Sequence, residues 1–156
     1  MPSWLDSLAR MTAALAIGAA IGWEREARGR PAGLRTHMLV GLGAAVIVML
    51  GADGGVGDEG RAIQGVATGV GFICAGEILH RVREGEERVK GLTSSAALWV
   101  TAALGMAAAT HHWVLAFGGA AATMLTLTVA RRFERPTSKS PVGLETPRRQ
   151  DRQAGS

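Results

Sequence analysis

The chain alternates long apolar segments with short charged ones, a pattern that predicts membrane-spanning helices rather than a soluble fold. Between Gly91 and Ala130, forty consecutive residues contain no Asp, Glu, Lys or Arg. Because a helix needs about 20 apolar residues to cross a bilayer, this segment alone has the length of two spans. We therefore predict an all-α membrane protein whose five transmembrane helices cover about residues 4–23, 36–52, 62–79, 92–110 and 113–130.

A four-span arrangement is the alternative to this count. It places residues 91–130 in one helix followed by a re-entrant segment, whereas five spans divide the block at His111–His112–Trp113, its most polar point. The basic residues of the connections favour five spans: they number four in 24–35, one in 53–61, four in 80–91, none between the last two spans and seven after residue 130. Because cytoplasmic segments are enriched in Lys and Arg, the alternation predicts an N-terminus outside and a C-terminus in the cytoplasm.

The net charge of +4 belongs to the C-terminal segment. Residues 131–156 carry seven basic and three acidic residues, so the first 130 residues are balanced. This distribution does not indicate a nucleic-acid partner, since attraction of a basic tail to anionic lipid explains it more simply. The segment is poor in apolar residues, which is typical of disorder. We predict a transmembrane domain over residues 1–132 and a basic, disordered cytoplasmic tail over residues 133–156.

Small residues recur at four-residue spacing within the predicted spans. Gly18 and Gly22 form one GxxxG pair, Gly65 and Gly69 form another, and residues 93–109 carry a stripe of Thr, Ala and Gly. Small faces let membrane helices approach closely and gain dispersion contacts. Such faces serve either a dimer interface or tight packing within the chain, and the sequence leaves both open.

Charged residues near the ends of the predicted spans are candidates for a structural or functional role. Glu24 and Arg35 lie at facing ends of the first two spans, so an ion pair between them would lock the intervening loop. Ionisable groups close to the hydrocarbon are costly without a partner. Glu77, in the last turn of the third span, is placed either to pair with Arg81 four residues later or to bind a cation.

No constellation in the sequence predicts catalysis or a resident metal. P-loop, HExxH, nucleophile-elbow and CxxC motifs are absent, and no nucleophile stands beside a base. The second connection contains Asp53, Asp58 and Glu59, whose oxygens are the hard ligands that Mg²⁺ prefers, but a flexible glycine-rich turn does not set octahedral geometry. The single cysteine, Cys74, is expected to be a small packing residue. We expect neither an enzyme nor a bound cofactor.

Four segments together resemble the membrane domain of the MgtC/SapB family. They are GWERE at 22–26, AGLRTHMLVGLGAA at 32–45, GRAIQGVATGVGFICAG at 60–76 and GLTSSAALWVTAALG at 91–105. Their order and spacing match the family over about residues 8–130, with departures at Cys74, Glu77 and Ser94–Ser95. The candidate functional or structural residues are Glu24, Arg25, Gly33, Arg35, Thr36, Arg61, Gln64, Gly69, Gly71, Phe72, Gly76, Glu77, Gly91, Thr93 and Trp99.

The resemblance implies a multi-pass protein of the bacterial inner (plasma) membrane, linked to magnesium homeostasis or low-magnesium adaptation. In pathogens it also implies a role in survival inside host cells. Members of the family are regarded as regulators of other membrane proteins, and the F-type ATP synthase is one suggested partner. The leading hypothesis is a non-enzymatic regulator that binds a membrane partner, with homo-oligomerisation compatible with its small helix faces. The alternative is a transporter or channel for Mg²⁺ or another cation that uses Glu77 and Gln64.

Overall fold

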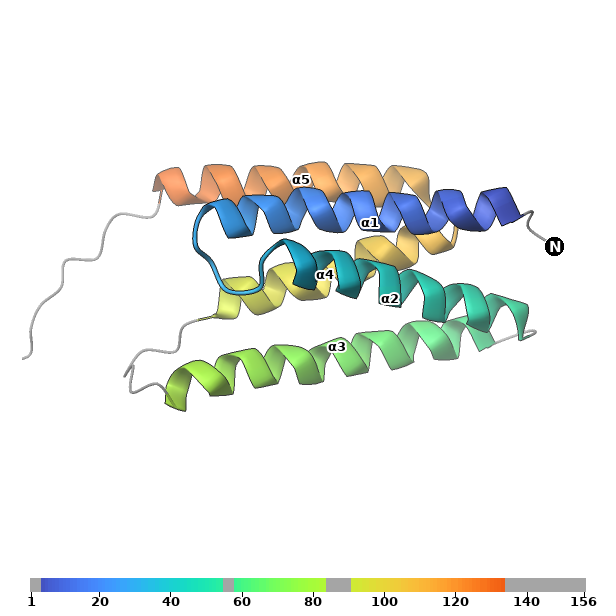
Figure 1. The fold of residues 1–156 in the computed structure, drawn as a ribbon, viewed down its shortest axis with the longest axis horizontal. Helices are drawn as coiled ribbons and strands as arrows, with labels where there is room; N and C mark the ends of the chain where they lie inside the picture. Colours follow the sequence, from blue (N-terminus) through green and yellow to red (C-terminus); the bar gives the residue numbers. More distant parts are fainter. Residues whose placement is uncertain (1–3, 55–57, 84–90, 134–156) are drawn as a thin grey trace, which may run out of the picture.

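The computed structural model describes residues 4–54, 58–83 and 91–133, and every regular element in these ranges is a helix (Figure 1). The prediction of an all-α fold with five helices is confirmed. Three of the helices, α1, α2 and α4, are long and apolar enough to cross a membrane, and α5 is apolar over Trp113–Val129. The helices are α1 (Trp4–Ala27), α2 (Leu34–Asp53), α3 (Asp58–Arg83), α4 (Leu92–Ala109) and α5 (Trp113–Phe133).

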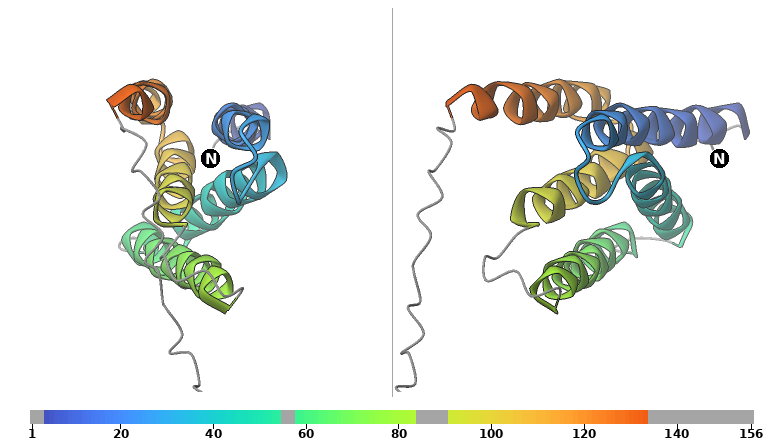
Figure 2. Two further views of the ribbon diagram at one scale, coloured as in Figure 1. Left: turned by 90° about the vertical axis from the view of Figure 1, so that its left-hand side faces the viewer. Right: turned by 60° about the vertical axis from the view of Figure 1, so that its left-hand side comes forward.

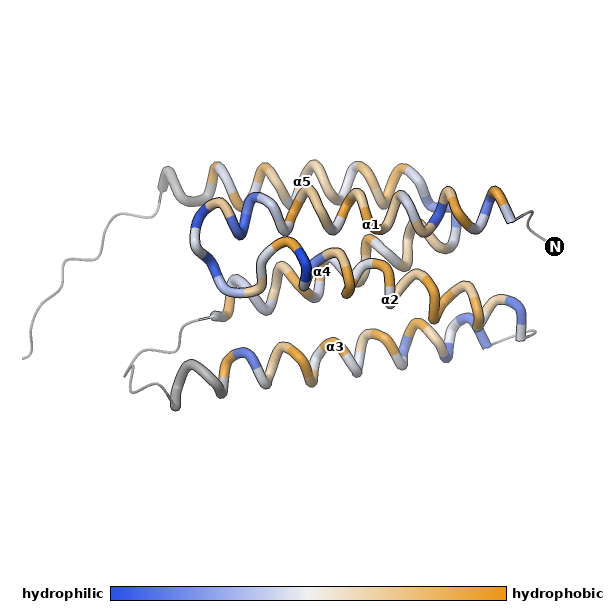
Figure 3. Tube along the Cα trace, viewed as in Figure 1, coloured by the Kyte–Doolittle hydropathy of each residue, from blue (hydrophilic) through white to orange (hydrophobic). Residues whose placement is uncertain are grey.

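The helices run up and down beside one another, so their ends fall into two groups. The carboxyl ends of α1, α3 and α5 lie at the end that holds the α1–α2 connection, on the left in Figure 1. We call this the loop end, and the opposite end, with the turn at residues 110–112, the far end. Hydrophilic residues concentrate at the two ends, above all along the α1–α2 connection, while the middle of most helices is apolar (Figure 3). The described helix ends that flank the connections predicted to be cytoplasmic thus lie at one end of the fold.

The core is formed where α1, α2 and α4 pack against one another, with α3 and α5 on opposite sides of this group (Figure 2). Its buried side chains are small or aliphatic, including Ala14, Ile21, Ala45, Val48 and Ala108. Such small side chains bring the helix backbones together, which increases the dispersion contacts on which membrane helices depend. The α1, α2 and α4 group is therefore the closely packed part against which α3 and α5 lie.

Glycines set the distance between the core helices. A Cβ atom on Gly18 would lie 2.6 Å from the carbonyl oxygen of His37, and one on Gly22 would lie 2.7 Å from the Cα atom of Leu34. A Cβ atom on Gly105 of α4 would meet the backbone of Gly41 in α2. The first GxxxG pair and the α4 stripe therefore serve packing within the chain, one of the two alternatives that the sequence left open.

The second GxxxG pair behaves differently. Cβ atoms on Gly65 and Gly69 of α3 would meet nothing within 4 Å, and the same holds for Gly71 and Gly76. Both pairs have the same spacing, but only the first is used for close approach in this structure. The predicted tail, residues 133–156, lies beyond the described residues apart from Phe133, the last residue of α5, so its boundary and its disorder stay predictions.

Candidate functional site

Polar side chains gather at the loop end, where α1, α2 and α4 meet. We call them the loop-end cluster, and its members are Glu24, Arg25, Arg28, His37 and Ser94. All except Arg28 are buried, and the side chain of Arg28 is 30% exposed. Charged groups removed from water lose several kcal/mol of hydration free energy each, so their hydrogen bonds and ion pairs decide whether the arrangement is stable.

Glu24 forms an ion pair with Arg28, one helical turn later, with 2.5 Å between its Oε1 and the arginine Nη1. The predicted Glu24–Arg35 lock is therefore wrong. Helix α1 continues to Ala27, beyond the predicted end of the span at residue 23, and this last turn places the side chain of Arg28, the next residue, beside Glu24 four positions earlier. Arg35 is exposed and borders a groove between α2 and α3.

Arg25 and His37 connect the helices of the cluster. The Arg25 guanidinium donates a hydrogen bond to the hydroxyl of Ser94, which joins the end of α1 to the first turn of α4. His37 is completely buried, its Nδ1 lies 3.0 Å from the Gly33 carbonyl oxygen, and the charges of Arg25 and Glu24 act on its ring. The cluster is thus one electrostatic unit that spans three helices.

Glu24 Oε2 and His37 Nε2 are buried without a hydrogen bond to any described residue. Buried polar atoms without a hydrogen bond are rare in proteins and often mark strain or a functional role. The cluster thus holds buried charged groups at the loop end of the bundle.

A second polar region lies at the far end. Arg10 pairs with Asp6, as their spacing indicates, and also donates a hydrogen bond of 2.9 Å to the carbonyl oxygen of Ala109. His111 lies 3.5 Å from the same Asp6 carboxylate. A cavity of about 470 Å³ opens here, lined by Arg10, Asp53, Glu59, His111 and His112 among others.

The acidic residues described at the far end do not form a set of metal ligands. Asp58 lies 3.9 Å from Arg61, and both side chains are exposed, so this pair contributes little to stability. Asp53 and Glu59 face the cavity together with the positive charge of Arg10. Within residues 4–54, 58–83 and 91–133, no three His, Cys, Asp or Glu side chains come together as metal ligands.

The other predicted residues are distributed over several places. Gly33 and Gly91 precede α2 and α4 as their N-caps, and Gly91 needs the conformational freedom of glycine because its φ is +102°. Thr36 of α2 and Gly69 of α3 line a groove between these two helices. Gln64, Gly71, Phe72, Gly76, Thr93 and Trp99 are exposed, and Glu77 is half-buried.

Of the predicted residues, the structure brings together only Glu24 and Arg25 in one polar cluster. The side chain of Arg81 is outside the described residues, so the Glu77–Arg81 pairing stays a prediction.

Sequence reasoning missed His37, Ser94 and Glu26. His37 is the only ionisable residue between Arg35 and Asp53, and an ionisable residue inside an apolar helix is a recognisable signal. Glu26 accepts a hydrogen bond of 2.8 Å from the backbone N–H of Leu34 at the start of α2. A carboxylate there satisfies an otherwise unpaired helix donor and complements the helix dipole.

Comparison with known proteins agrees with the motif order. The chain is 43% identical over 143 residues to the protein SrpB of Synechococcus elongatus, covering 85% of this chain and 79% of SrpB. It is 44% identical over 126 residues to the Escherichia coli protein named "Putative magnesium transporter YhiD", covering 75% of this chain and 56% of that protein.

It is also 42% identical over 96 residues to the protein MgtC of Salmonella typhimurium, covering 62% of this chain and 40% of MgtC. The chain thus spans about half the length, or less, of these last two relatives. No solved structure matches it. The profile of the MgtC family matches residues 11–136, which is most of the chain. With its apolar helices, this chain is a membrane protein and belongs to the MgtC family.

Proposed function

We propose that this protein is a non-enzymatic regulator of magnesium or general ion homeostasis in the bacterial inner membrane, and that it acts by binding another membrane protein. All five helices cross the bilayer in this proposal, with the N-terminus outside and the loop end in the cytoplasm. Family membership and the magnesium-related name of a relative support the physiological setting. The distribution of packed and open helix faces supports the mode of action.

The observation that carries the proposal is the outer face of α3, formed by Gln64, Thr68, Gly71, Phe72 and Gly76. All five residues are exposed, and Phe72 is exposed to 83%. Their spacing places them on one stripe of the helix, away from the side that faces α2. A large aromatic side chain flanked by glycines suits a helix–helix contact, since the glycines allow close approach and the ring supplies contact area.

The side-chain amide of Gln64 also favours a partner helix, because it can form a hydrogen bond to it. Its side chain is exposed on an otherwise weakly polar stripe of a helix that we place in the bilayer. An amide in hydrocarbon gains free energy by forming a hydrogen bond to a neighbouring helix. Thr68 already donates its hydroxyl to the Gln64 carbonyl oxygen, at 2.9 Å, so the Gln64 side-chain amide is the polar group that the stripe offers to a partner.

The second candidate function, cation transport, is favoured by the name of the YhiD relative. In the structure, the residues proposed for it, Gln64 and Glu77, do not line the groove between α2 and α3. The one charged residue that lines that groove is Arg35, whose positive charge repels cations. A path for Mg²⁺ along this side of α3 is therefore electrostatically unfavourable.

A pair of matched glycine variants tests the regulator proposal. Gly71→Leu adds bulk to the outer face of α3, and Gly118→Leu adds the same bulk to α5, where a Cβ atom also meets nothing within 4 Å. We expect both proteins to fold. Gly71→Leu is expected to lose co-purifying membrane proteins in mild detergent, together with growth at low magnesium in a complemented deletion strain, while Gly118→Leu keeps both.

The partner is identified from the co-purified material, and subunits of the F-type ATP synthase are the first to be sought. Equal behaviour of the two variants would remove α3 as the docking face. The transporter alternative is tested separately, with purified protein in vesicles that contain a Mg²⁺-sensitive dye. Flux that disappears in Glu77→Ala would replace the regulator proposal, whereas absence of flux together with a partner lost in Gly71→Leu supports it.

A further inference from the structure

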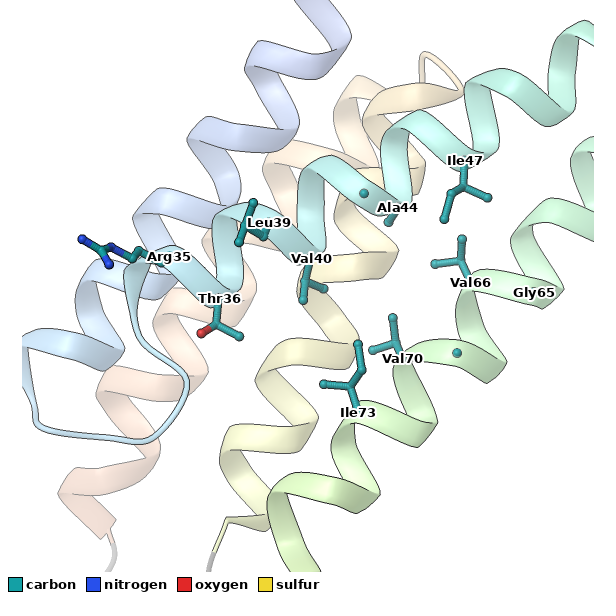
Figure 4. A pocket seen from close by; sticks show the side chains of 12 residues that line it. Arg35, Thr36, Leu39, Val40, Ala44, Ile47, Gly65, Val66, Val70 and Ile73 are labelled. Atoms are coloured by element: carbon teal, nitrogen blue, oxygen red, sulfur yellow. The ribbon is translucent and has the colours of Figure 1, made fainter. Parts of the chain in front are cut away.

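A groove of about 580 Å³ runs between α2 and α3 on the outside of the bundle (Figure 4). From α2 its lining includes Val40 and Ile47, and from α3 it includes Val70 and Ile73. Glycines open it further, because Cβ atoms on Gly43, Gly65 and Gly69 would meet nothing within 4 Å. The groove is therefore apolar, accessible from the side, and wide because the residues at these positions lack side chains.

The length of the groove corresponds to one leaflet of a bilayer. It follows α2 from Thr36, near the loop end, to Ile47, which is about 17 Å at 1.5 Å per residue. The hydrocarbon core of a bilayer is about 30 Å thick, so one leaflet accounts for about 15 Å. A transmembrane helix of a partner would need a groove about twice as long.

The lining of the groove suits the same kind of occupant. Its side chains from α2 and α3 are mostly aliphatic and several of its positions are glycines, so an extended hydrocarbon chain can lie along it in contact with both helices.

A positive charge stands at the end of the groove where a lipid headgroup would lie. Arg35 borders the groove with its side chain exposed, and its guanidinium points past the N-terminus of α2, out of the apolar part (Figure 4). The groove lining contains no acidic residue. Arginine presents several N–H donors in a plane and pairs well with phosphate.

We propose that the groove between α2 and α3 is a binding site for an anionic glycerophospholipid, whose acyl chain lies between Val40, Ile47, Val70 and Ile73 and whose phosphate pairs with Arg35. The apolar length selects a lipid over a helix, and the guanidinium selects an anionic headgroup over a zwitterionic one. The site uses the inner side of α3 and is independent of the outer face on which the proposed function depends. It holds for either orientation of the chain in the membrane.

Spin-labelled lipids in reconstituted vesicles test the proposal. The full chain is placed in phosphatidylcholine vesicles that contain either labelled phosphatidylglycerol or labelled phosphatidylcholine, and the immobilised fraction is measured by electron paramagnetic resonance. We expect phosphatidylglycerol to be preferred about fivefold, the size expected for one arginine near the membrane surface. The preference should fall at high salt because the charges are then screened.

Three variants separate the parts of the site. Arg35→Gln is expected to abolish the preference for phosphatidylglycerol, while Arg30→Gln, which removes an exposed arginine of the α1–α2 connection that does not line the groove, keeps it. Gly69→Leu fills the groove and is expected to reduce immobilisation of both labelled lipids. Gly118→Leu is its control, because it adds the same side chain at an open position of α5.

The proposal is overturned if the wild-type protein shows no preference, or if Arg30→Gln and Arg35→Gln reduce it equally. It is also overturned if a second copy occupies the groove, which would appear as disulfide-linked dimers of an Ile47→Cys variant in the Cys74→Ser background. Loss of the lipid preference in Arg35→Gln with full function at low magnesium would leave the proposed function intact. The two ideas therefore fail separately.

Discussion

Replacement of Gly18 by alanine places a methyl group directly against the backbone of α2. The new Cβ atom would lie 2.6 Å from the His37 carbonyl oxygen and 2.9 Å from both the His37 carbonyl carbon and the Met38 Cα atom. Ordinary contacts begin near 3.4 Å, so α1 and α2 must separate by about 0.8 Å. All three neighbours are backbone atoms, which no side-chain rotation can move.

Such overpacking costs about 1–3 kcal/mol in a well-packed core. Alanine also favours the helix over glycine by about 1 kcal/mol, which offsets part of that cost. We therefore expect Gly18→Ala to destabilise the protein by up to about 2 kcal/mol. At Gly118, where a Cβ atom meets nothing within 4 Å, the same substitution should stabilise it by up to about 1 kcal/mol.

Unfolding in mixed micelles of dodecyl maltoside and increasing sodium dodecyl sulfate, followed by circular dichroism, measures both variants against the wild type. The two substitutions are chemically identical, so opposite signs isolate the contact with α2. If Gly18→Ala and Gly118→Ala changed the free energy of unfolding in the same direction, close packing of α1 on α2 at Gly18 would be refuted.

The remaining predictions concern pairs of side chains. Arg28→Glu should impair folding, because it faces the buried Glu24 with a like charge, whereas Arg35→Glu should leave the thermal midpoint in detergent unchanged; the opposite order would restore the Glu24–Arg35 pairing. Cys74 and Ser95 exchange hydrogen bonds of 3.2 Å with each other's carbonyl oxygens and so link α3 to α4. Cys74→Ala and Ser95→Ala each remove one of these bonds and keep the acceptor carbonyl of the other, so each should lower the free energy of unfolding by about 0.6 kcal/mol; no loss in either variant would show that the bonds are not formed.

The loop-end cluster shows how far local spacing carries a prediction. Asp6 and Arg10 are four residues apart inside one helix, and they pair as expected, since one turn brings their side chains together. The spacing across the loop predicts a pair between Glu24 and Arg35, but α1 continues past residue 23 to Ala27 and so places Arg28, the residue after the helix, beside Glu24. His37 and Ser94 were not foreseen as members of the cluster, because their contacts join residues of different helices.

The sequence alone determined that this protein is a set of apolar helices with charged ends. The hydrocarbon of a bilayer offers no hydrogen-bond partners, so an apolar stretch that crosses it must satisfy its own backbone groups, and a helix does this within one segment. It did not determine which of the two GxxxG pairs forms a close helix contact. Gly18 and Gly22 pack against the backbone of α2, while Gly65 and Gly69 line a groove and have no neighbouring atom within 4 Å of a Cβ position. Glycine spacing gives each helix a small face, but the choice of neighbour depends on how all five helices fit together, and only the tertiary structure decides that.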